Sequence, residues 1–368
     1  SFSNALTTTY TYANTLSGLT LGKSGNASDI AFNSVASLSG DVVMYGDNVS
    51  LAASLTTSGD VLITASSAVT QSAAISAAGL GLNGAATFTL NNSSNIIGTL
   101  AAGDSNNRVG HLNVLSGVDL AVGSVGSTAG VFSGGNVAIT SLGDLAINES
   151  VNSSGGTVTL KSAGSINQAA SKSVSTLSGN ITYWSDSDAS GSGNIELAAL
   201  SSISSSGGNV VLSGGASTST GYAVGDAANS HGILLNRASI NSGAGSITLR
   251  GQGKGTGYGV FLSGNTSSQS IDVGVELIST SGNIDIDAKG SGSGSSYGTA
   301  FMMHYANNEI SSSSGNISIN TTGALELFRD NVGTGAAPLV QTAGAGTLSL
   351  TTTSGGFTSN SAILKAAE

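Results

Sequence analysis

A short phrase recurs along the whole chain: a glycine, one small or polar residue, and then apolar residues alternating with polar ones. Clear examples are GNVAI at residues 135–139, GTVTL at 156–160, GNIDI at 282–286 and GNISI at 315–319. One such phrase is too short to bury its own apolar face, so neighbouring copies must supply each other's core. The phrase therefore predicts a solenoid.

The alternation within each phrase indicates strands. Val137 and Ile139 alternate with polar or small residues, which places one apolar row inward and one row outward. Glycine and serine interrupt nearly every candidate helix. Early phrases lie about twenty residues apart, which is room for three short strands, or one coil of a right-handed parallel β-helix. An antiparallel sandwich would need repeated Asn-Gly or Asp-Gly turns, and Asn83-Gly84 is an isolated case.

We therefore predict an all-β chain that forms a right-handed parallel β-helix of about fourteen coils. Residues 1–207 are expected to form regular coils of about 20 residues, and residues 208–368 to continue the same elongated domain with enlarged coils of 31–37 residues. The added residues follow Gly/Ser/Thr-rich stretches and contain Tyr222, Tyr258 and Tyr297. Loops between about Gly214 and Gly346 should then stack on one side and form the contact surface.

The turns between strands explain much of the glycine and asparagine. Glycine reaches the positive φ angles of tight turns without a steric penalty. Asparagine follows glycine in several of the repeated phrases, where we expect the side-chain amides of successive coils to stack in a ladder. These positions are Asn136, Asn180, Asn194, Asn209, Asn283 and Asn316.

Composition argues against several classes of partner. Only 8% of residues are charged and the net charge is -10, which opposes binding to nucleic acid or anionic lipid. The chain has no cysteine, so disulfides and thiolate metal sites are impossible. No stretch reaches the roughly eighteen apolar residues of a membrane span, and we expect no membrane insertion in this segment.

The repeated Ser-Gly-Asn-Ile-x-Ile phrases at 281–286 and 314–319, with Gly-rich inserts before Tyr-Gly-Val, carry a family resemblance. The chain resembles the filamentous haemagglutinin-like adhesins of the two-partner secretion route and the related autotransporter passenger domains. That resemblance implies a β-helical fibre, exposed on a bacterial surface or released, that acts in adhesion, aggregation or biofilm formation. The Asn-Pro-Asn signature of the family's secretion domain is absent, which leaves the export route open.

Aromatic residues are the candidate binding residues. Tyr183 and Trp184 are adjacent in a strand, so one should face the core and the other should be exposed, where it could stack on a sugar ring. Stacking within the rod is the simpler interpretation. Tyr222, Tyr258 and Tyr297 are expected to form a ladder, either as internal packing or as a binding strip.

Calcium is the candidate metal, because it accepts carboxylate and carbonyl oxygens from loops. Asp186 and Asp188 could supply two ligands, although a polar turn is the simpler interpretation, and no other cofactor is expected. Asp285 and Asp287 share one outward face and form the candidate catalytic pair. Because Thr248 and Ser318 should flank Asp285 on the neighbouring coils, a solvated strand face is the simpler interpretation.

These observations predict a non-enzymatic, extracellular structural or adhesive rod. Its expected partners are glycans or proteins on host or neighbouring cells, or copies of itself joined end to end. The alternatives are a subunit of a head-to-tail filament or sheath, and a polysaccharide-degrading β-helix enzyme.

Overall fold

The computed structural model describes residues 17–265, 273–292, 298–329 and 335–366. The chain divides by its internal contacts into two compact units, residues 1–157 and residues 158–368. This division precedes the predicted change in coil length at Gly208. Every regular element in the described ranges is a strand. These ranges therefore contain no helix long and apolar enough to cross a membrane.

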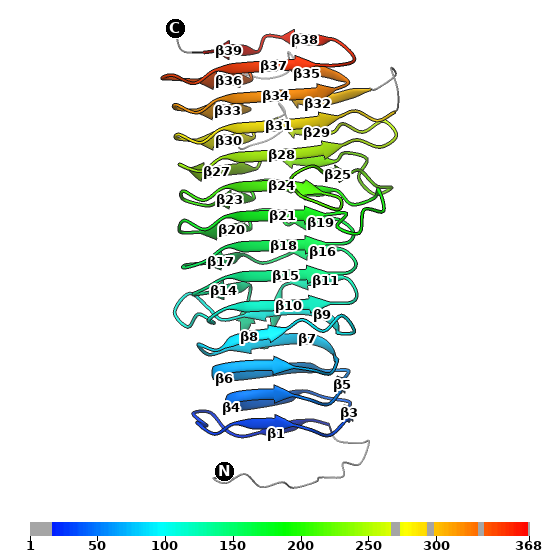
Figure 1. The fold of residues 1–368 in the computed structure, drawn as a ribbon, viewed down its shortest axis with the longest axis vertical. Helices are drawn as coiled ribbons and strands as arrows, with labels where there is room; N and C mark the ends of the chain where they lie inside the picture. The colour runs from blue at the N-terminus through cyan, green and yellow to red at the C-terminus, as the bar shows by residue number, and fades with distance from the viewer. Residues whose placement is uncertain (1–16, 266–272, 293–297, 330–334, 367–368) are drawn as a thin grey trace. The chain divides into compact units, whose positions relative to one another are not determined.

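Unit 2 is a parallel β-helix in which each coil contributes one strand to each of three faces, as Figure 1 shows for successive rungs of the first face. The first sheet contains β18 (Val158–Ser162), β21 (Ile181–Ser185), β24 (Val210–Gly214), β28 (Ile247–Gln252), β31 (Ile284–Lys289), β34 (Ile317–Thr322) and β37 (Leu348–Thr352). The second sheet contains β19 (Ile166–Gln168), β22 (Ile195–Leu197), β26 (Ile233–Asn236), β29 (Val260–Ser263), β32 (Thr299–His304), β35 (Ala324–Phe328) and β38 (Phe357–Asn360). The third sheet contains β20 (Ser173–Thr176), β23 (Ser202–Ser204), β27 (Ser239–Gly243), β30 (Glu276–Ser279), β33 (Glu309–Ser312), β36 (Leu339–Thr342) and β39 (Ile363–Lys365).

Alternation within these strands builds the core. Ile247 and Leu249 of β28 pair with Ile284 and Ile286 of β31, and all four side chains have no exposed surface. Burying a side chain of this size contributes about 1.5–3 kcal/mol. The predicted all-β parallel β-helix is thus confirmed.

Coils in unit 2 are longer than about twenty residues, and the lengthening begins one coil before the predicted boundary at residue 208. Hydrogen bonds between equivalent corner positions join residues 29 apart at Asn180 and Asn209, 37 apart at Asn209 and Ser246, and 33 apart at Asn283 and Asn316. Additional residues lie between the first and second sheets, after β24, β28 and β31, and between the second and third sheets, after β29 and β35. The insert after β24 carries its own short strand, β25 (Ala223–Val224), which pairs in parallel with β28.

Unit 1 follows the same plan, with long strands that turn a corner and join two ladders each. Residues 60–64 of β6 pair with β7, while residues 68–70 pair with β8. One ladder contains β2 (Ile30–Phe32), the second half of β4 (Val42–Leu51), the second half of β6 (Asp60–Gln71), β8 (Thr87–Leu90), β10 (Leu112–Ser116) and β15 (Val137–Ser141). The others are built from β1 (Leu19–Leu21), β3 (Ala36–Leu38), β5 (Leu55–Thr57), β7 (Ile75–Asn83), β9 (Ile96–Ala102), β11 (Leu120–Val122), β14 (Val131–Ser133), β16 (Leu145–Ile147) and β17 (Val151–Ser153).

An antiparallel hairpin interrupts the solenoid pattern in unit 1. Its strands are β12 (Ser124–Val125) and β13 (Thr128–Ala129), and Thr128 exchanges hydrogen bonds with Asn83 of β7. A Cβ added to Gly79 would lie 2.9 Å from a methyl group of Val125, so a side chain at position 79 would clash with the hairpin. Glycine at this position therefore reflects a contact with a segment far along the chain.

Corner glycines in unit 2 serve close packing between coils and do not adopt the positive φ that the sequence suggested. Gly245, Gly282 and Gly315 are absent from the residues with positive φ. A Cβ on Gly282 would lie 2.1 Å from the carbonyl oxygen of Gly245, and one on Gly315 would lie 2.1 Å from that of Gly282. Glycine is required because each corner rests directly on the backbone of the preceding corner.

The predicted asparagine ladder exists in a different chemical form. The Oδ1 atom of Asn180 accepts a bond of 2.8 Å from the backbone N–H of Asn209, and Asn283 accepts one of 3.0 Å from that of Asn316. Each side chain thus caps the backbone of the next coil and does not bond to the next amide. Asn194 lies elsewhere, and its Nδ2 donates to Asp226 at 3.0 Å.

Candidate functional site

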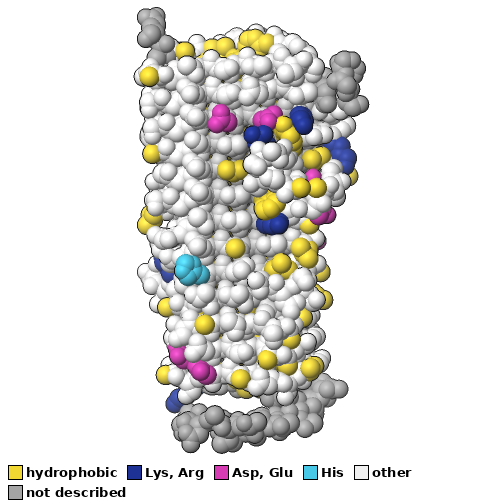
Figure 2. Space-filling view, viewed as in Figure 1, with side chains coloured by type: hydrophobic (Ala, Val, Ile, Leu, Met, Phe, Trp, Pro, Cys, Tyr) yellow, Lys and Arg dark blue, Asp and Glu magenta, His cyan; other side chains and the backbone are white. Residues whose placement is uncertain are grey.

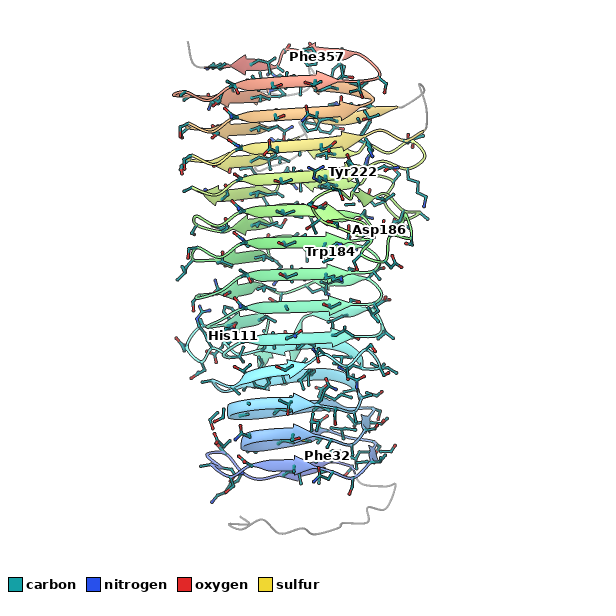
Figure 3. The ribbon with its side chains drawn as sticks, in the orientation of Figure 1. Phe32, His111, Trp184, Asp186, Tyr222 and Phe357 are labelled. Carbon is teal, nitrogen blue, oxygen red and sulfur yellow. The ribbon has the colours of Figure 1, made fainter. Side chains whose placement is uncertain are left out.

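One group of aromatic and charged side chains lies on the outer face of the first sheet of unit 2. We call it the outer-face cluster, and it consists of Lys161, Trp184, Tyr222, Arg250, Asp287 and Lys289. Figure 2 shows basic, acidic and apolar side chains gathered beside the insert, on a face of unit 2 that is otherwise largely uncharged. Figure 3 shows Trp184 and Tyr222 in this part of the unit.

Strand alternation separates Tyr183 from Trp184, as predicted. Tyr183 is fully buried and donates its hydroxyl to Oε1 of Gln168 at 2.6 Å, and its burial raises the pKa of that hydroxyl well above the usual value. Trp184 faces outward and is half-buried. Its Nε1 donates to the carbonyl of Gly215 at 2.6 Å, and the ammonium of Lys161 lies 4.0 Å from the ring centroid.

The insert after β24 brings Tyr222 onto the same face, two coils beyond its own. The Tyr222 hydroxyl donates to Oδ2 of Asp287 at 2.8 Å, and the Lys289 ammonium lies 4.0 Å from the centre of the tyrosine ring. Burial, reinforced by the Asp287 carboxylate, raises the pKa of Tyr222 to about 12. The phenol therefore stays protonated and acts as a hydrogen-bond donor at neutral pH.

Arg250 and Asp287 form an ion pair between neighbouring strands. Arg250 Nη1 lies 2.6 Å from Asp287 Oδ2, and the two side chains are 26% and 32% exposed. Asp285 lies between Thr248 and Ser318, as the sequence predicted. The residue beside Asp287 on the neighbouring strand is the basic Arg250, which the sequence analysis did not identify.

The pKa of Asp285 differs from that of an ordinary surface carboxyl. Loss of water around the group raises its pKa, and the Arg250 guanidinium partly opposes the increase. The strand that carries Asp287 and Lys289 therefore also carries a carboxyl that takes up a proton more readily than a fully solvated aspartate.

Glycines close the insert against the sheet. The Ser213 hydroxyl donates to the carbonyl of Gly221 at 2.8 Å, and the backbones of Gly193 and Val224 exchange hydrogen bonds of 2.9 Å. A Cβ on Gly221 would lie 2.0 Å from the carbonyl oxygen of Gly214. These contacts hold Tyr222 over the face of the sheet.

The remaining predicted tyrosines do not extend a ladder from Tyr222. Tyr258 instead stacks on His231, with ring centroids 5.0 Å apart, and contacts the edge of Phe261 at 5.1 Å. This second aromatic group lies beside β29 of the second sheet, and the rings of Tyr222 and Tyr258 make no contact with each other. Tyr297 lies outside the described residues.

The two aspartates proposed for calcium take part in a loop of hydrogen bonds. Asp186 is buried, and its Oδ1 accepts bonds of 3.0 Å from the Ser190 hydroxyl and from the Gly191 N–H. Asp188 accepts a bond of 3.2 Å from the Ser190 N–H. Across the ranges that the structure describes, no three or more histidine, cysteine or acidic side chains are grouped in a way that could hold a metal ion. Calcium binding stays a prediction, and the observed bonds close the loop.

Sequence reasoning missed the three basic members of the cluster, although a signal for two of them was present. Lys161, Trp184, Arg250 and Asp287 each lie five residues after a corner glycine, so alignment of the repeated phrases places them in one outward column. Tyr222 could not be added in this way because it comes from the insert.

No family model, curated protein or solved structure matches this chain. The arrangement of side chains therefore carries the functional argument.

Proposed function

We propose that this chain is a non-enzymatic, extracellular structural and adhesive module of a bacterial surface or secreted fibre protein. In this proposal the β-helix provides a regular scaffold, and the outer-face cluster is its contact surface. The observation that carries the proposal is the concentration of cations and aromatic rings on one face of a sheet, in a chain in which only 8% of residues are charged. Exposed groups of this kind are typical of recognition surfaces.

The bonding of Asp287 favours recognition over catalysis. Its Oδ2 atom already accepts from both Tyr222 and Arg250. A glycoside hydrolase needs two carboxyl groups on either side of the scissile bond, one of them available as a base or nucleophile. The enzymatic alternative predicts that the chain releases reducing ends from an acidic polysaccharide and that Asp285→Asn abolishes this activity. Both observations together would replace our proposal.

The filament alternative rests on the last coil. Phe357 pairs with the fully buried Leu325 and Leu364 with the fully buried Val340, yet these two residues are 47% and 40% exposed. Figure 3 marks Phe357 at this position. A coil of a second copy stacked on this end would cover these side chains. Concentration-dependent growth of polymers in analytical ultracentrifugation would favour the filament alternative.

An adhesion assay tests the main proposal. Beads that carry the full chain at high density are expected to stay on bacterial or epithelial cell layers under flow, because many weak contacts add through multivalency. Beads with Lys161→Ala/Lys289→Ala should detach. Beads with Lys23→Ala/Lys365→Ala lose the same two charges at exposed positions elsewhere, and they should behave like wild type. Equal detachment of the beads that carry wild type, Lys161→Ala/Lys289→Ala and Lys23→Ala/Lys365→Ala would contradict a role for the cluster in adhesion.

A further inference from the structure

We infer that the outer-face cluster binds an acidic polysaccharide, whose carboxylate or sulfate groups contact Lys161 and Lys289 while its sugar rings pack beside Trp184 and Tyr222. The inference rests on the proposed adhesive function and names the ligand class of the same surface.

The cations of the cluster outnumber the negative charge that they meet. Asp287 is the carboxylate partner of Arg250, whereas neither ammonium has a carboxylate partner among the described residues. The Nε of Arg250 is buried and has no hydrogen-bond partner there. In a chain of net charge -10, this is a local excess of donors suited to an anion.

The distance between the two ammonium groups favours a chain-like ligand. Lys161 lies on β18 and Lys289 on β31, with β21, β24 and β28 between them. Four steps between parallel strands span about 19 Å. One sugar cannot reach both groups, whereas an oligosaccharide of several rings can.

The aromatic groups lie between these two ends. Trp184 and Tyr222 are both half-buried, and their polar atoms are already bonded to Gly215 and Asp287. One face of each ring lies under the ammonium of Lys161 or Lys289, so what the rings still offer a ligand is their remaining exposed apolar surface, which suits the C–H groups of a sugar ring. This combination of spaced cations and apolar rings matches a polysaccharide that carries a charge at intervals.

The acidic residues at the cluster argue against nucleic acid. Asp287 lies beside Arg250 and on the same strand as Lys289, and Asp285 is the preceding outward residue of that strand, so a closely spaced row of phosphates would meet negative charge there. A polysaccharide can place uncharged hydroxyls at the same positions, where a carboxylate accepts hydrogen bonds from them.

The experiment measures binding of the purified full chain to four immobilised polymers by biolayer interferometry. Polygalacturonate tests carboxylate recognition, heparin tests sulfate recognition, dextran is the uncharged polymer, and single-stranded DNA tests phosphate recognition. We expect binding to one or both acidic polysaccharides, and binding to them should weaken as salt rises. Lys161→Ala/Lys289→Ala should weaken it by about tenfold, and Lys23→Ala/Lys365→Ala should leave it unchanged.

Equal thermal unfolding of the two double variants shows that the loss reflects binding and not folding. Binding to dextran as tight as to the acidic polymers, preference for DNA, or the same loss in both double variants would each overturn the inference. If the bead assay shows adhesion that depends on the cluster and neither acidic polysaccharide binds, the ligand class is wrong and the adhesive function stands. If the beads fail to adhere and an acidic polysaccharide still binds, the adhesive function is wrong.

Discussion

The hydroxyl of Tyr222 donates a 2.8 Å hydrogen bond to Oδ2 of Asp287, a residue 65 positions further along the chain. This bond joins the insert after β24 to β31, two coils beyond the coil that carries the insert. The bond links the insert, which varies in length between coils, to a strand of the regular first sheet. It also places the Tyr222 ring beside the ammonium of Lys289.

Loss of this bond should loosen the insert. We expect Tyr222→Phe to reduce the free energy of unfolding by about 0.5–1.5 kcal/mol, because Asp287 keeps Arg250 as a partner. Amide hydrogen exchange of residues 215–225 should become faster. Tyr45→Phe, on β4 of unit 1, is the control and should leave those rates unchanged. Unaltered exchange in Tyr222→Phe would show that the bond does not hold the insert.

Alkaline pH should act on the same bond. The pKa of Tyr222 rises to about 12 in the folded chain, mainly through burial, from an ordinary value of 10.0. The unfolded chain therefore loses this proton first, so the stabilisation is complete below pH 10 and is lost as pH rises from 10 to 12. Unfolding measured across that range should show a smaller decline in Tyr222→Phe than in wild type. Equal declines in the two proteins would contradict this assignment.

A methyl group at a corner glycine should disturb the stacking of coils. Gly282→Ala places a Cβ 2.1 Å from the carbonyl oxygen of Gly245, and the backbone must shift. We expect a loss of about 1–3 kcal/mol in chemical denaturation. Gly356→Ala is the matched control, because a Cβ there meets nothing within 4 Å, and its stability should stay near that of wild type. Similar stability of the two variants would mean that the corners tolerate side chains.

The hydrogen bonds between corner asparagines of successive coils require a side-chain oxygen as acceptor and do not require the amide group. Asn283→Ala removes the acceptor of the Asn316 N–H and should cost about 1 kcal/mol, whereas Asn283→Asp keeps the acceptor and should cost less. Thermal unfolding of the two variants checks this order. A larger loss in Asn283→Asp would restore the interpretation of amide stacking.

Mild acid should weaken unit 2 through His231. The Nδ1 of His231 accepts from the Tyr258 N–H at 3.0 Å, and burial lowers the pKa of the ring below 6.5. The unfolded chain thus takes up the proton at higher pH, so stability is complete above pH 6.5 and falls as pH drops through the folded pKa. His231→Gln should reduce the change in unfolding free energy between pH 7 and pH 5. An unchanged pH dependence in that variant would remove His231 as its source.

Most of the architecture could be predicted because it depends on local periodicity. Alternation placed Val137 and Ile139 inside, and glycine spacing located the longer coils. The reason predicted for the corner glycines was wrong, since close contact with Gly245 or Gly282 is a property of stacked backbones and leaves no local signal in a turn. Other glycines, such as Gly207 and Gly243, do adopt the predicted positive φ. The same holds for Gly79, whose neighbour Val125 belongs to a hairpin many residues away.

The repeated phrase alone determined that this chain is an all-β parallel solenoid, because a unit that cannot bury its own apolar face must stack on its copies. It also determined which coils are enlarged. Only the tertiary structure decided which side chains meet on the surface. Tyr222 reaches Asp287 and Lys289 because the insert crosses neighbouring rungs, and Trp184 bonds to Gly215 because that insert folds back over its strand. Contacts of this kind depend on the path of a loop in space, which the period of a repeat does not encode.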